Sequence, residues 1–391
     1  MKLTPIHPFP ARMAPEIVFK ELQGLNSPQI VLDPMSGSGT VLRAAVELGH
    51  QAVGFDLDPL AVLMARVWTT PFAVNRLPKA AEKLVQKAKA AKDVYLPWVD
   101  ECEETKEYID FWFSEKQKRA LRRLSFALAG TSGVQADAMR IALSRIIITK
   151  ERGASIARDT SHSRPHRVFF DNDYDVYEGF LQSATRLTSR LSPEKLLGSA
   201  VVNGGDSRRL SLLAPNSVDV VITSPPYLNA IDYLRGHRLS LVWLGYKVSE
   251  VRALRSDSIG SERSSESEIS ASKLKSLLHK AGNVADLPTR ELGMVERYAQ
   301  DVCGFLQELA RVAKKGGKVL LVVGNSCLKN VPIWNADINV AAAEIAGFTM
   351  ISRSERALPD SNRYLPMPAL NKSGSLGLRM RTETLLSFSL R

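Results

Sequence analysis

Residues 29–59 read QIVLDPMSGSGTVLRAAVELGHQAVGFDLDP, and this stretch decides the fold. It begins with a short apolar run over 29–32, which predicts a buried strand. A glycine-containing turn over 33–40 then opens a helix over 41–48, and a second strand follows over 51–55. Strand, turn, helix and strand in this order form a βαβ unit, which predicts an α/β protein with a mainly parallel sheet.

The turn after the first strand predicts a binding site for a nucleoside. Gly37 and Gly39 allow the backbone to approach a ligand closely. Asp56 follows Asp33 by 23 residues, near the spacing of about 20 at which an acidic side chain binds a ribose hydroxyl. The turn lacks the third glycine of a dinucleotide fingerprint and the lysine of a P-loop. We therefore expect a single nucleoside without a pyrophosphate, although a Gly-x-Gly turn alone is also common in structural loops.

The second motif is TSPPY at residues 223–227, directly after the apolar run 218–222. It predicts a buried strand that ends in a rigid turn, at the sheet edge where open α/β sheets bind ligands. Because prolines have no N–H, the carbonyls of Ser224 and Pro225 can accept hydrogen bonds from an amino group. The Ser224 hydroxyl is a further acceptor, and Tyr227 offers a ring for stacking. A proline-stopped strand with a core tyrosine is the structural alternative, and the glycine turn upstream favours the ligand site.

Charge predicts a polyanionic partner. The net charge is +11, and between Glu115 and Arg167 twelve lysines and arginines stand against four acidic residues, an excess of +8. A solvated helical face is the alternative explanation of such a run. The tail of this region, residues 152–167, also combines side chains that can bind phosphates and base edges. The candidate DNA-binding residues are Arg158, Ser161, His162, Arg164 and Arg167.

Length, composition and cysteine spacing indicate the domain organisation, the cell compartment and whether a metal or a membrane is expected. At 391 residues and 45% hydrophobic content, the chain can form one large globular domain with insertions or two domains. Cys102, Cys303 and Cys327 have no paired spacing, so we expect no disulfide framework, no metal and a reducing cytoplasm. His162 and His166 are interpreted as loop histidines rather than metal ligands. No run approaches the roughly 20 apolar residues of a membrane helix, so we expect no membrane association.

Three segments are predicted: a cofactor-binding half over 1–75, a basic helical insertion over 76–198, and a catalytic half over 199–391. A serine-rich stretch near 256–272 predicts a mobile surface loop. Further helices and strands are expected from their periodicity. The helices are 15–22, 60–68, 79–92, 114–129, 136–149, 174–191, 231–244, 294–313 and 336–346, and the strands are 200–202, 318–323, 349–353 and 383–390.

Three motifs together resemble the amino-directed S-adenosylmethionine-dependent DNA methyltransferases, which methylate N4 of cytosine or N6 of adenine. The motifs are DPMSGSGT at 33–40, TSPPY at 223–227 and HPFPAR at 7–12. The resemblance covers residues 1–70 and 200–391. It implies a Rossmann-like methyltransferase sheet in which 76–198 is an insertion for recognition of DNA.

The resemblance also implies a role for each matched residue. Asp56 would accept hydrogen bonds from the ribose, Asp206 would bind the adenine amino group, and residues 7–12 would cover the methionine end of the cofactor. Ser224 and the Pro225 carbonyl would hold the target amino group, and Tyr227 would stack on the base. The implied catalytic set is Ser224, Pro225, Pro226 and Tyr227, and the implied cofactor set is Pro8, Phe9, Asp33, Pro34, Ser36, Gly37, Gly39, Thr40, Asp56, Asp58 and Asp206.

Ser224 as the first catalytic position of the second motif, with Thr223 before it, looks most like the N4-cytosine members. The expected activity is therefore transfer of a methyl group to cytosine N4 in duplex DNA by base flipping, as in restriction-modification systems, with a cognate restriction endonuclease left open as a partner. N6-adenine methylation is the first alternative, because the motif order differs from that of many N4-cytosine members. An RNA base-amino methyltransferase is the second, although only about thirty residues precede the cofactor motif. A non-enzymatic nucleic-acid binder that kept the fold is the third.

Overall fold

The computed structural model describes residues 3–9, 12–25, 28–147, 149, 152–158, 165–167, 173–191, 196–228, 232–260, 269–358 and 382–391. Three of the predicted DNA-binding residues, Ser161, His162 and Arg164, lie outside these ranges. So does the middle of the predicted serine-rich loop, residues 261–268.

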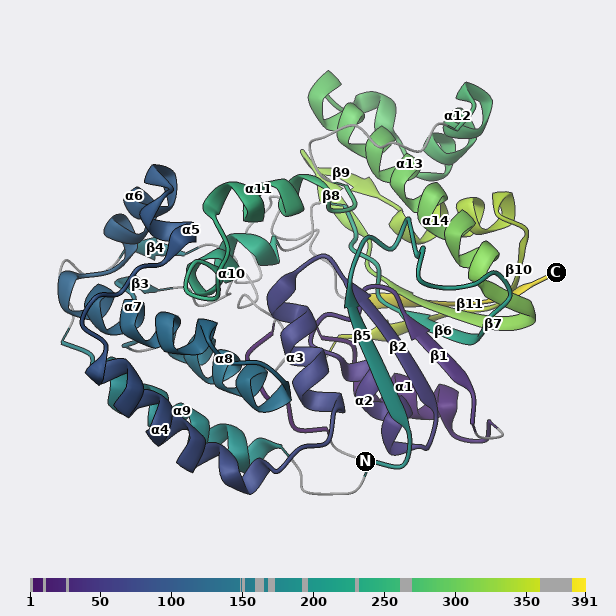
Figure 1. The fold of residues 1–391 in the computed structure, drawn as a ribbon. Coiled ribbons are helices and arrows are strands. Elements are labelled where there is room, and N and C mark those ends of the chain that lie inside the picture. Colours follow the sequence, from purple (N-terminus) through teal and green to yellow (C-terminus); the bar gives the residue numbers. More distant parts are fainter. Residues whose placement is uncertain are drawn as a thin grey trace.

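A seven-stranded sheet forms the centre of the described chain, in the order β10-β11-β7-β6-β1-β2-β5 (Figure 1). β1 pairs in parallel with β2 and β6, β2 with β5, and β6 with β7, whereas β11 is antiparallel to both of its neighbours. The Rossmann-like α/β class predicted from the sequence is confirmed. The strands are β1 (Ile30–Asp33), β2 (Gln51–Asp56), β5 (Ser199–Gly204), β6 (Val218–Thr223), β7 (Ala313–Val323), β10 (Phe348–Ala357) and β11 (Thr382–Leu390).

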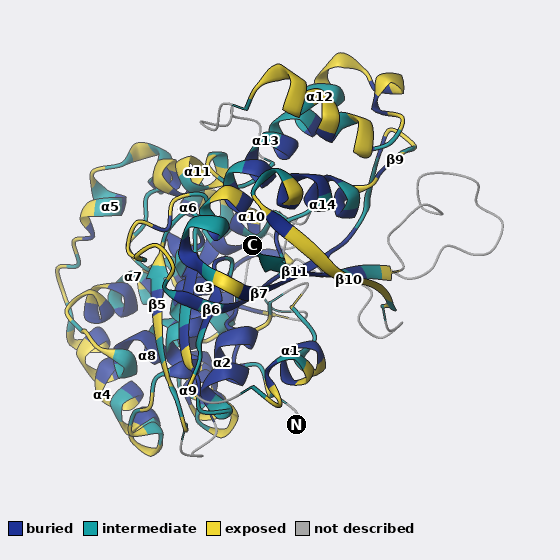
Figure 2. Cartoon of the chain, turned by 90° about the vertical axis from the view of Figure 1, so that its right-hand side faces the viewer, coloured by how far each residue is buried: buried dark blue, intermediate teal, exposed yellow. Residues whose placement is uncertain are grey.

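The central strands are apolar on both sides because helices cover both faces of the sheet. On β1, Val31 packs into the core under α1 and α2, whereas Leu32 packs into the core under α13 and α14. Figure 2 shows the contrast between these buried strands and the exposed edge strand β10. The helices are α1 (Pro15–Leu22), α2 (Thr40–Glu47) and α3 (Pro59–Thr69) on one side, and α12 (Ala271–Lys280), α13 (Thr289–Val312) and α14 (Asn335–Ile345) on the other.

A helical insertion stands between α3 and β5, beside the sheet and away from β10 (Figure 1). Its apolar side chains form one core with α3, α10 (Tyr233–Leu241) and α11 (Val248–Ser256), so the insertion is packed against the central fold. Its elements are α4 (Leu77–Ala90), α5 (Pro97–Asp100), α6 (Glu103–Trp112), α7 (Glu115–Ala129), α8 (Val134–Ile147), β3 (Ala157–Arg158), β4 (His166–Arg167) and α9 (Val176–Arg190).

Several elements were not predicted. α5 and α6 occupy a stretch whose apolar residues are too irregular for a clear helical period, and α11 and α12 flank the serine-rich segment. The hairpin β8 (Ser326–Leu328) and β9 (Val331–Ile333) directly follows β7, and both of its turn residues, Lys329 and Asn330, have positive φ. Short 3₁₀ turns are η1 (Val74–Arg76) and η2 (Val284–Asp286).

Candidate active site

The two sequence motifs meet at the point where the strand order reverses. β1 is followed along the chain by β2 on one side, and β6 returns on the other side, which is the topological switch point where α/β sheets bind ligands. A buried hydrogen bond joins the two turns, because the Thr223 hydroxyl donates to Oδ1 of Asp33 at 2.7 Å. The glycine turn and the TSPPY turn therefore lie next to each other at one edge of the sheet.

The carboxylate of Asp56 organises the glycine turn. Its Oδ2 accepts the N–H of Gly37 at 2.7 Å, and its Oδ1 accepts the N–H of Asp58 at 2.9 Å. The Ser36 N–H donates to the carbonyl of Phe55 at 2.8 Å, which ties the turn to the end of β2. Pro34 and Thr40 are buried at the two ends of the same turn. The predicted cofactor residues of this turn are thus held in one rigid unit.

The turn has unused hydrogen-bonding groups that suit a nucleoside ligand. Among the described residues, the hydroxyls of Ser36 and Ser38 are buried without a hydrogen-bond partner, and a buried polar group of this kind needs one. A Cβ on Gly37 would lie 3.0 Å from the ring of Phe9, so this glycine leaves only a narrow space beneath the ring. Orphaned hydroxyls, a bare backbone and an aromatic ring fit the polar sugar and flat base of a nucleoside.

An aromatic lid lies over the glycine turn. Phe9 stacks on Tyr233 of α10, with ring centroids 5.0 Å apart and an interplanar angle of 12°. The insertion holds the segment that carries Phe9, because Nη1 of Arg190 donates to the carbonyl of Pro5 at 2.8 Å and His7 Nε2 lies 3.0 Å from the Ser144 hydroxyl. Pro8 itself is exposed. Phe9 of the N-terminal segment therefore packs against Gly37 of the glycine turn, and its role as a cover for the methionine end of the cofactor stays a prediction.

Asp58 has a structural role that the sequence did not reveal. Its Oδ1 caps α3 by accepting the N–H of Leu60 at 2.9 Å, and its Oδ2 pairs with Nδ1 of the buried His237. His237 also lies beside Phe9, with ring centroids 5.7 Å apart. Both oxygens of this predicted cofactor residue thus have protein partners, and they lock α10 to the end of β2.

Burial shifts the acid–base behaviour of the two inner carboxyl groups. Loss of solvent raises the pKa of Asp33 to about 7, against the hydrogen bonds from Thr223 and Met35 that lower it. Loss of solvent and then the neighbouring charge of Asp58 raise the pKa of Asp56 to about 6. Both groups therefore take up protons in a pH range where an exposed carboxyl is ionised.

We predict that Asp33 makes the protein less stable as the pH rises. Its pKa is about 7 in the folded state against an ordinary value of 3.8, so the folded state binds more protons than the unfolded state between these values. Stability present below pH 4 is then lost as the pH rises through 7, by on the order of 4 kcal/mol. Asp33→Asn keeps an acceptor for Thr223 but cannot ionise. Urea unfolding from pH 4 to 8 should give a flatter curve for the variant, and parallel curves would contradict this assignment.

The TSPPY turn presents hydrogen-bond acceptors. The Ser224 hydroxyl donates its hydrogen to the carbonyl of Val322 in β7 at 2.9 Å, so its lone pairs remain to accept hydrogen bonds. Pro225 is buried, and Pro226 and Tyr227 are half-buried. Burial raises the pKa of Tyr227, which keeps the phenol neutral. Four predicted catalytic residues thus form one turn anchored to β1 through Thr223 and to β7 through Ser224.

Asp206 lies at the same edge of the sheet. β5 pairs with β2, with Gly204 opposite Asp56, and the Gly205 N–H donates to the carbonyl of Asp56 at 3.0 Å. The Asp206 carboxylate is held by Arg208, whose Nη2 donates to Oδ2 at 2.7 Å. Arg208 was not predicted as a site residue, although its position two residues after the predicted Asp206 is a signal that could have identified it.

The described DNA-binding candidates lie elsewhere, on the β3–β4 ribbon of the insertion. Arg158 is exposed opposite His166, and the exposed Arg167 has its guanidinium 5.4 Å from the ring centroid of Phe111. A basic ribbon next to an exposed aromatic ring suits a nucleic acid, which has phosphates and flat bases.

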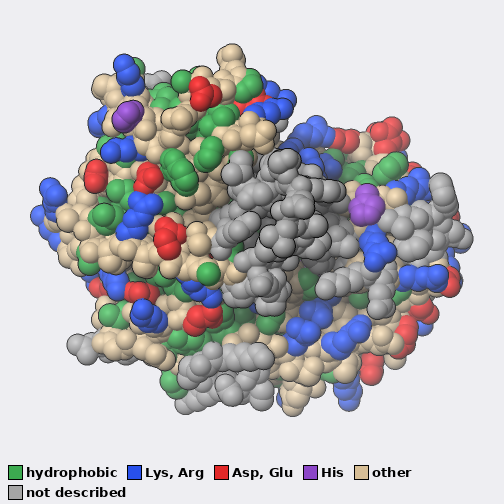
Figure 3. Space-filling model, turned by 180° about the vertical axis from the view of Figure 1, so that it is seen from behind, with side chains coloured by type: hydrophobic (Ala, Val, Ile, Leu, Met, Phe, Trp, Pro, Cys, Tyr) green, Lys and Arg blue, Asp and Glu red, His purple; other side chains and the backbone are tan. Residues whose placement is uncertain are grey.

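Several arginines of the insertion bind acidic side chains or backbone carbonyls of the protein itself. Arg122 pairs with Asp100 at 2.7 Å and Arg140 with Asp137 at 3.2 Å. Arg145 binds the carbonyl of Ile6, and burial lowers its pKa to about 10. Figure 3 shows lysine and arginine side chains spread over both halves of one face of the molecule rather than gathered on the insertion. The count of +8 therefore overstates the charge that a partner can reach.

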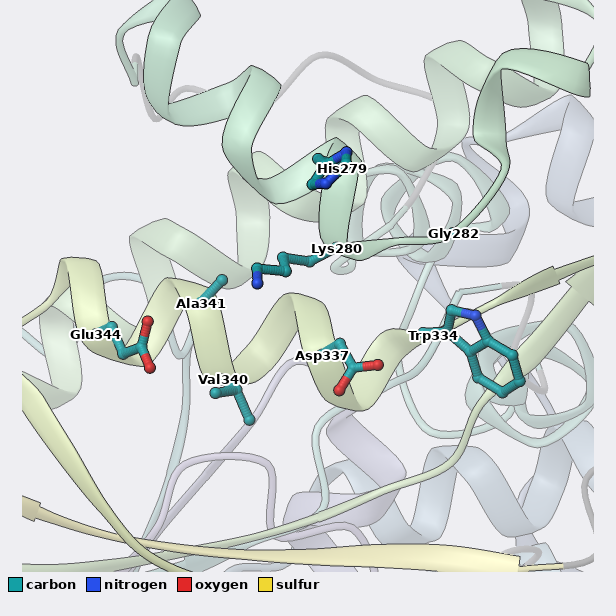
Figure 4. Close-up of a pocket in the computed structure, with 8 residues that line it drawn as sticks. All are labelled: His279, Lys280, Gly282, Trp334, Asp337, Val340, Ala341 and Glu344. Atoms are coloured by element: carbon teal, nitrogen blue, oxygen red, sulfur yellow. The ribbon is translucent and has the colours of Figure 1, made fainter.

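One surface pocket lies away from both turns, between α12 and α14 (Figure 4). It shares no residue with the glycine turn or the TSPPY turn and does not extend the site. The residues that line the pocket are His279, Lys280, Gly282, Trp334, Asp337, Val340, Ala341 and Glu344.

Among the described residues no group of three or more His, Cys, Asp or Glu side chains could hold a metal ion. In the described part of the chain, no helix has the length and apolar character needed to cross a membrane.

Comparison with known proteins gives relatives along nearly the whole chain. The type II methyltransferase M.MvaI of Kocuria varians is 23% identical to it, over 97% of this chain and 89% of its own length. M.BsoBI of Geobacillus stearothermophilus, also a type II methyltransferase, is 22% identical over 77% of this chain and 69% of its own length. The chain is similar to type II methyltransferases.

No protein-family model matches the chain. Among solved structures, a SAM-dependent methyltransferase of Methanosarcina mazei aligns with 97% of this chain and 98% of its own. It has 9% identity and a TM-score of 0.35. The similarity to type II methyltransferases thus rests on the sequence comparisons.

Proposed function

We propose that the protein is an S-adenosylmethionine-dependent DNA methyltransferase that modifies N4 of cytosine in duplex DNA. The observation that best supports this proposal is the hydrogen bond from Thr223 to Asp33, which joins the end of the strand before the TSPPY turn to the start of the glycine turn. The similarity to M.MvaI and M.BsoBI, both type II methyltransferases, supports methyl transfer to DNA. The insertion over 76–198 would recognise the target.

In this proposal the glycine turn holds the cofactor. The carboxylate of Asp56 and the unpaired hydroxyls of Ser36 and Ser38 would accept or donate hydrogen bonds to the nucleoside, and Phe9 would cover it. The bound cofactor supplies an already activated methyl group. The protein therefore contributes position and electrostatics and needs no covalent nucleophile.

The TSPPY turn would prepare the target amine. The lone pair of an exocyclic amine on cytosine is delocalised into the ring, which makes the amine a poor nucleophile. The Ser224 oxygen and the Pro225 carbonyl can each accept one of its two hydrogens. This geometry draws the amine out of the plane of the ring and localises the lone pair on nitrogen. The nitrogen would then bond to the methyl carbon as the bond from that carbon to sulfur breaks, with neutral S-adenosylhomocysteine as the leaving group, and one amine proton would pass to water.

A base in duplex DNA must leave the helix to reach such a turn. Base flipping costs a few kcal/mol of stacking and pairing energy, which a protein recovers through stacking and hydrogen bonds in its pocket. The ring of Tyr227, next to the two acceptors, would take over the stacking of the flipped base. N6 of adenine has the same amine chemistry and remains the second candidate target.

A labelling experiment that identifies the polymer that receives the methyl group tests this proposal. Purified protein with methyl-labelled S-adenosylmethionine should transfer label to duplex DNA and not to RNA of the same sequence. Label in RNA alone would favour the RNA methyltransferase alternative. Cofactor binding without transfer to either polymer would favour a nucleic-acid binder that kept the fold.

We predict that Arg158 and Arg167 each contribute one phosphate contact. Each lost contact lowers the slope of log K against log salt by about 0.9, so replacing both with glutamine should lower it by about 1.8. The control is Lys315, an exposed cation near the start of β7, at the end of the sheet opposite the two turns. Lys315→Gln should leave the slope unchanged. Fluorescence anisotropy with duplex DNA at several salt concentrations measures the slopes. Equal slopes for the wild type and the double variant would remove the ribbon from the DNA interface.

A further inference from the structure

We propose that Arg208 is a positioning residue, which turns the Asp206 carboxylate toward the adenine amino group of the cofactor and fixes it to α13 through Asp301. The proposal rests on the proposed function, because it concerns an adenosyl ligand. It concerns a residue that neither sequence motif contains.

The location of Asp206 makes it a candidate partner for the ligand. β5 and β2 are parallel neighbours, so their carboxyl ends lie side by side, and Gly204 is opposite Asp56. Asp206 follows two residues later, on the far side of Asp56 from the TSPPY turn. Its side chain keeps 25% exposure, so a ligand can reach the carboxylate. A nucleoside whose ribose is bound near Asp56 would extend its base along this edge.

Arg208 holds the Asp206 carboxylate in one orientation. The Arg208 backbone N–H donates to Oδ1 at 2.8 Å, Nη2 donates to Oδ2 at 2.7 Å, and Nε lies 3.1 Å from Oδ1 and 3.0 Å from Oδ2. A forked contact of this kind fixes the plane of a carboxylate, which a single point charge does not. A carboxylate offers about four acceptor positions, so these three donors leave capacity for one more donor from outside.

Asp301 anchors the guanidinium from the other side. Its side chain in α13 is only 2% exposed, its Oδ1 accepts from Nη1 of Arg208, and its Oδ2 accepts the Gly260 N–H at 2.8 Å. Nη2 of Arg208 also donates to the carbonyl of Asp257. Arg208 therefore joins the end of β5, the segment after α11 and a buried carboxylate in α13. A guanidinium tied at three places cannot rotate freely, and neither can the carboxylate it holds.

The test compares two ligands on the same protein. The probes are S-adenosylhomocysteine and its analogue with hydrogen in place of the adenine amino group, and calorimetry gives both dissociation constants. A hydrogen bond to a carboxylate makes the analogue bind roughly tenfold to hundredfold more weakly to the wild type. In Arg208→Gln this ratio should fall below about threefold, because the carboxylate loses its orientation. Arg208→Lys should not restore the ratio, since an ammonium group cannot make the forked contact.

Arg311→Gln is the matched control. Arg311 of α13 also ties the segment after β5 to this helix, because it donates to the carbonyls of Leu210 and Leu213, but its carboxylate partner is Glu308 of the same helix rather than Asp206. This variant should lose stability and keep the wild-type ratio. The ratio is measured within each variant, so a general loss of stability cancels.

Each contrary outcome has a distinct meaning. An unchanged ratio in Arg208→Gln would overturn the positioning role. Equal binding of both ligands by the wild type would overturn it as well, because Asp206 would then not contact the amino group, while the proposed function would stand. Failure of the wild type to bind either ligand would contradict the proposed function itself.

Discussion

A Gly39→Ala variant is expected to lose about 2–5 kcal/mol of unfolding free energy and, with it, measurable cofactor binding. Gly39 has a φ of +89°, which costs an L-residue about 1–2 kcal/mol. An added Cβ would also lie 2.8 Å from the Cα of Ala65 in α3. Helix backbone cannot move aside cheaply, and overpacking of this kind typically costs about 1–3 kcal/mol. The glycine turn would therefore shift away from α3.

A Gly24→Ala variant separates the cost of a positive φ from the cost of overpacking. Gly24 has a similar φ of +96°, but an added Cβ there would have no heavy atom within 4 Å. This variant should lose only the backbone cost, about 1–2 kcal/mol, and bind the cofactor normally. Urea unfolding and calorimetric titration measure both effects. Equal unfolding midpoints for the two variants would mean that the close packing of Gly39 against α3 does not exist in solution.

Ser224→Ala is expected to lower kcat roughly 10- to 100-fold while the cofactor dissociation constant stays the same. The hydroxyl donates to Val322, so the atom lost at the active site is an acceptor. An acceptor that localises the lone pair acts in the transition state, and its loss therefore lowers kcat more than it weakens binding. Single-turnover kinetics with saturating cofactor and DNA isolates this step.

Ser217→Ala is the control for loss of a hydroxyl from the same strand region. Ser217 precedes β6 at its opposite end and also donates to a backbone carbonyl, that of Ala214 at 2.6 Å. Its replacement should leave kcat unchanged. A Ser224→Ala enzyme as fast as this control would remove the hydroxyl from the mechanism and leave the carbonyl of Pro225 as the acceptor.

The parts of the fold that the sequence predicts are those with a strong local signal. β1, β2 and β6 are short, mainly apolar runs with a proline within three residues of their ends, and the structure has them within one or two residues of the predicted bounds. α1 begins at Pro15 as predicted, because proline is favourable in the first turn of a helix. The strand ends then bring Asp33, Asp56 and Thr223 together, since parallel strands share an edge. Motif spacing therefore located the site.

The interactions that the sequence did not predict join residues far apart along the chain. Asp58 pairs with His237 across 179 residues, and Arg208 pairs with Asp301 across 93. Neither pair has a periodic or local signature, so only the packed fold brings the partners together. The same limit applies to charge, because a count along the sequence cannot separate the half-buried Arg145, which binds the carbonyl of Ile6, from the exposed Arg158.

The most direct test of the central claim is mass spectrometry of nucleosides from duplex DNA incubated with the protein and methyl-deuterated S-adenosylmethionine. The account predicts deuterated N4-methylcytosine, which is absent when Ser224→Ala replaces the wild type at short reaction times. N6-methyladenine in its place would keep the site and its chemistry but contradict the assigned base. DNA without any deuterated nucleoside, from protein that binds the cofactor, would contradict the claim that the two turns form a DNA methyltransferase site.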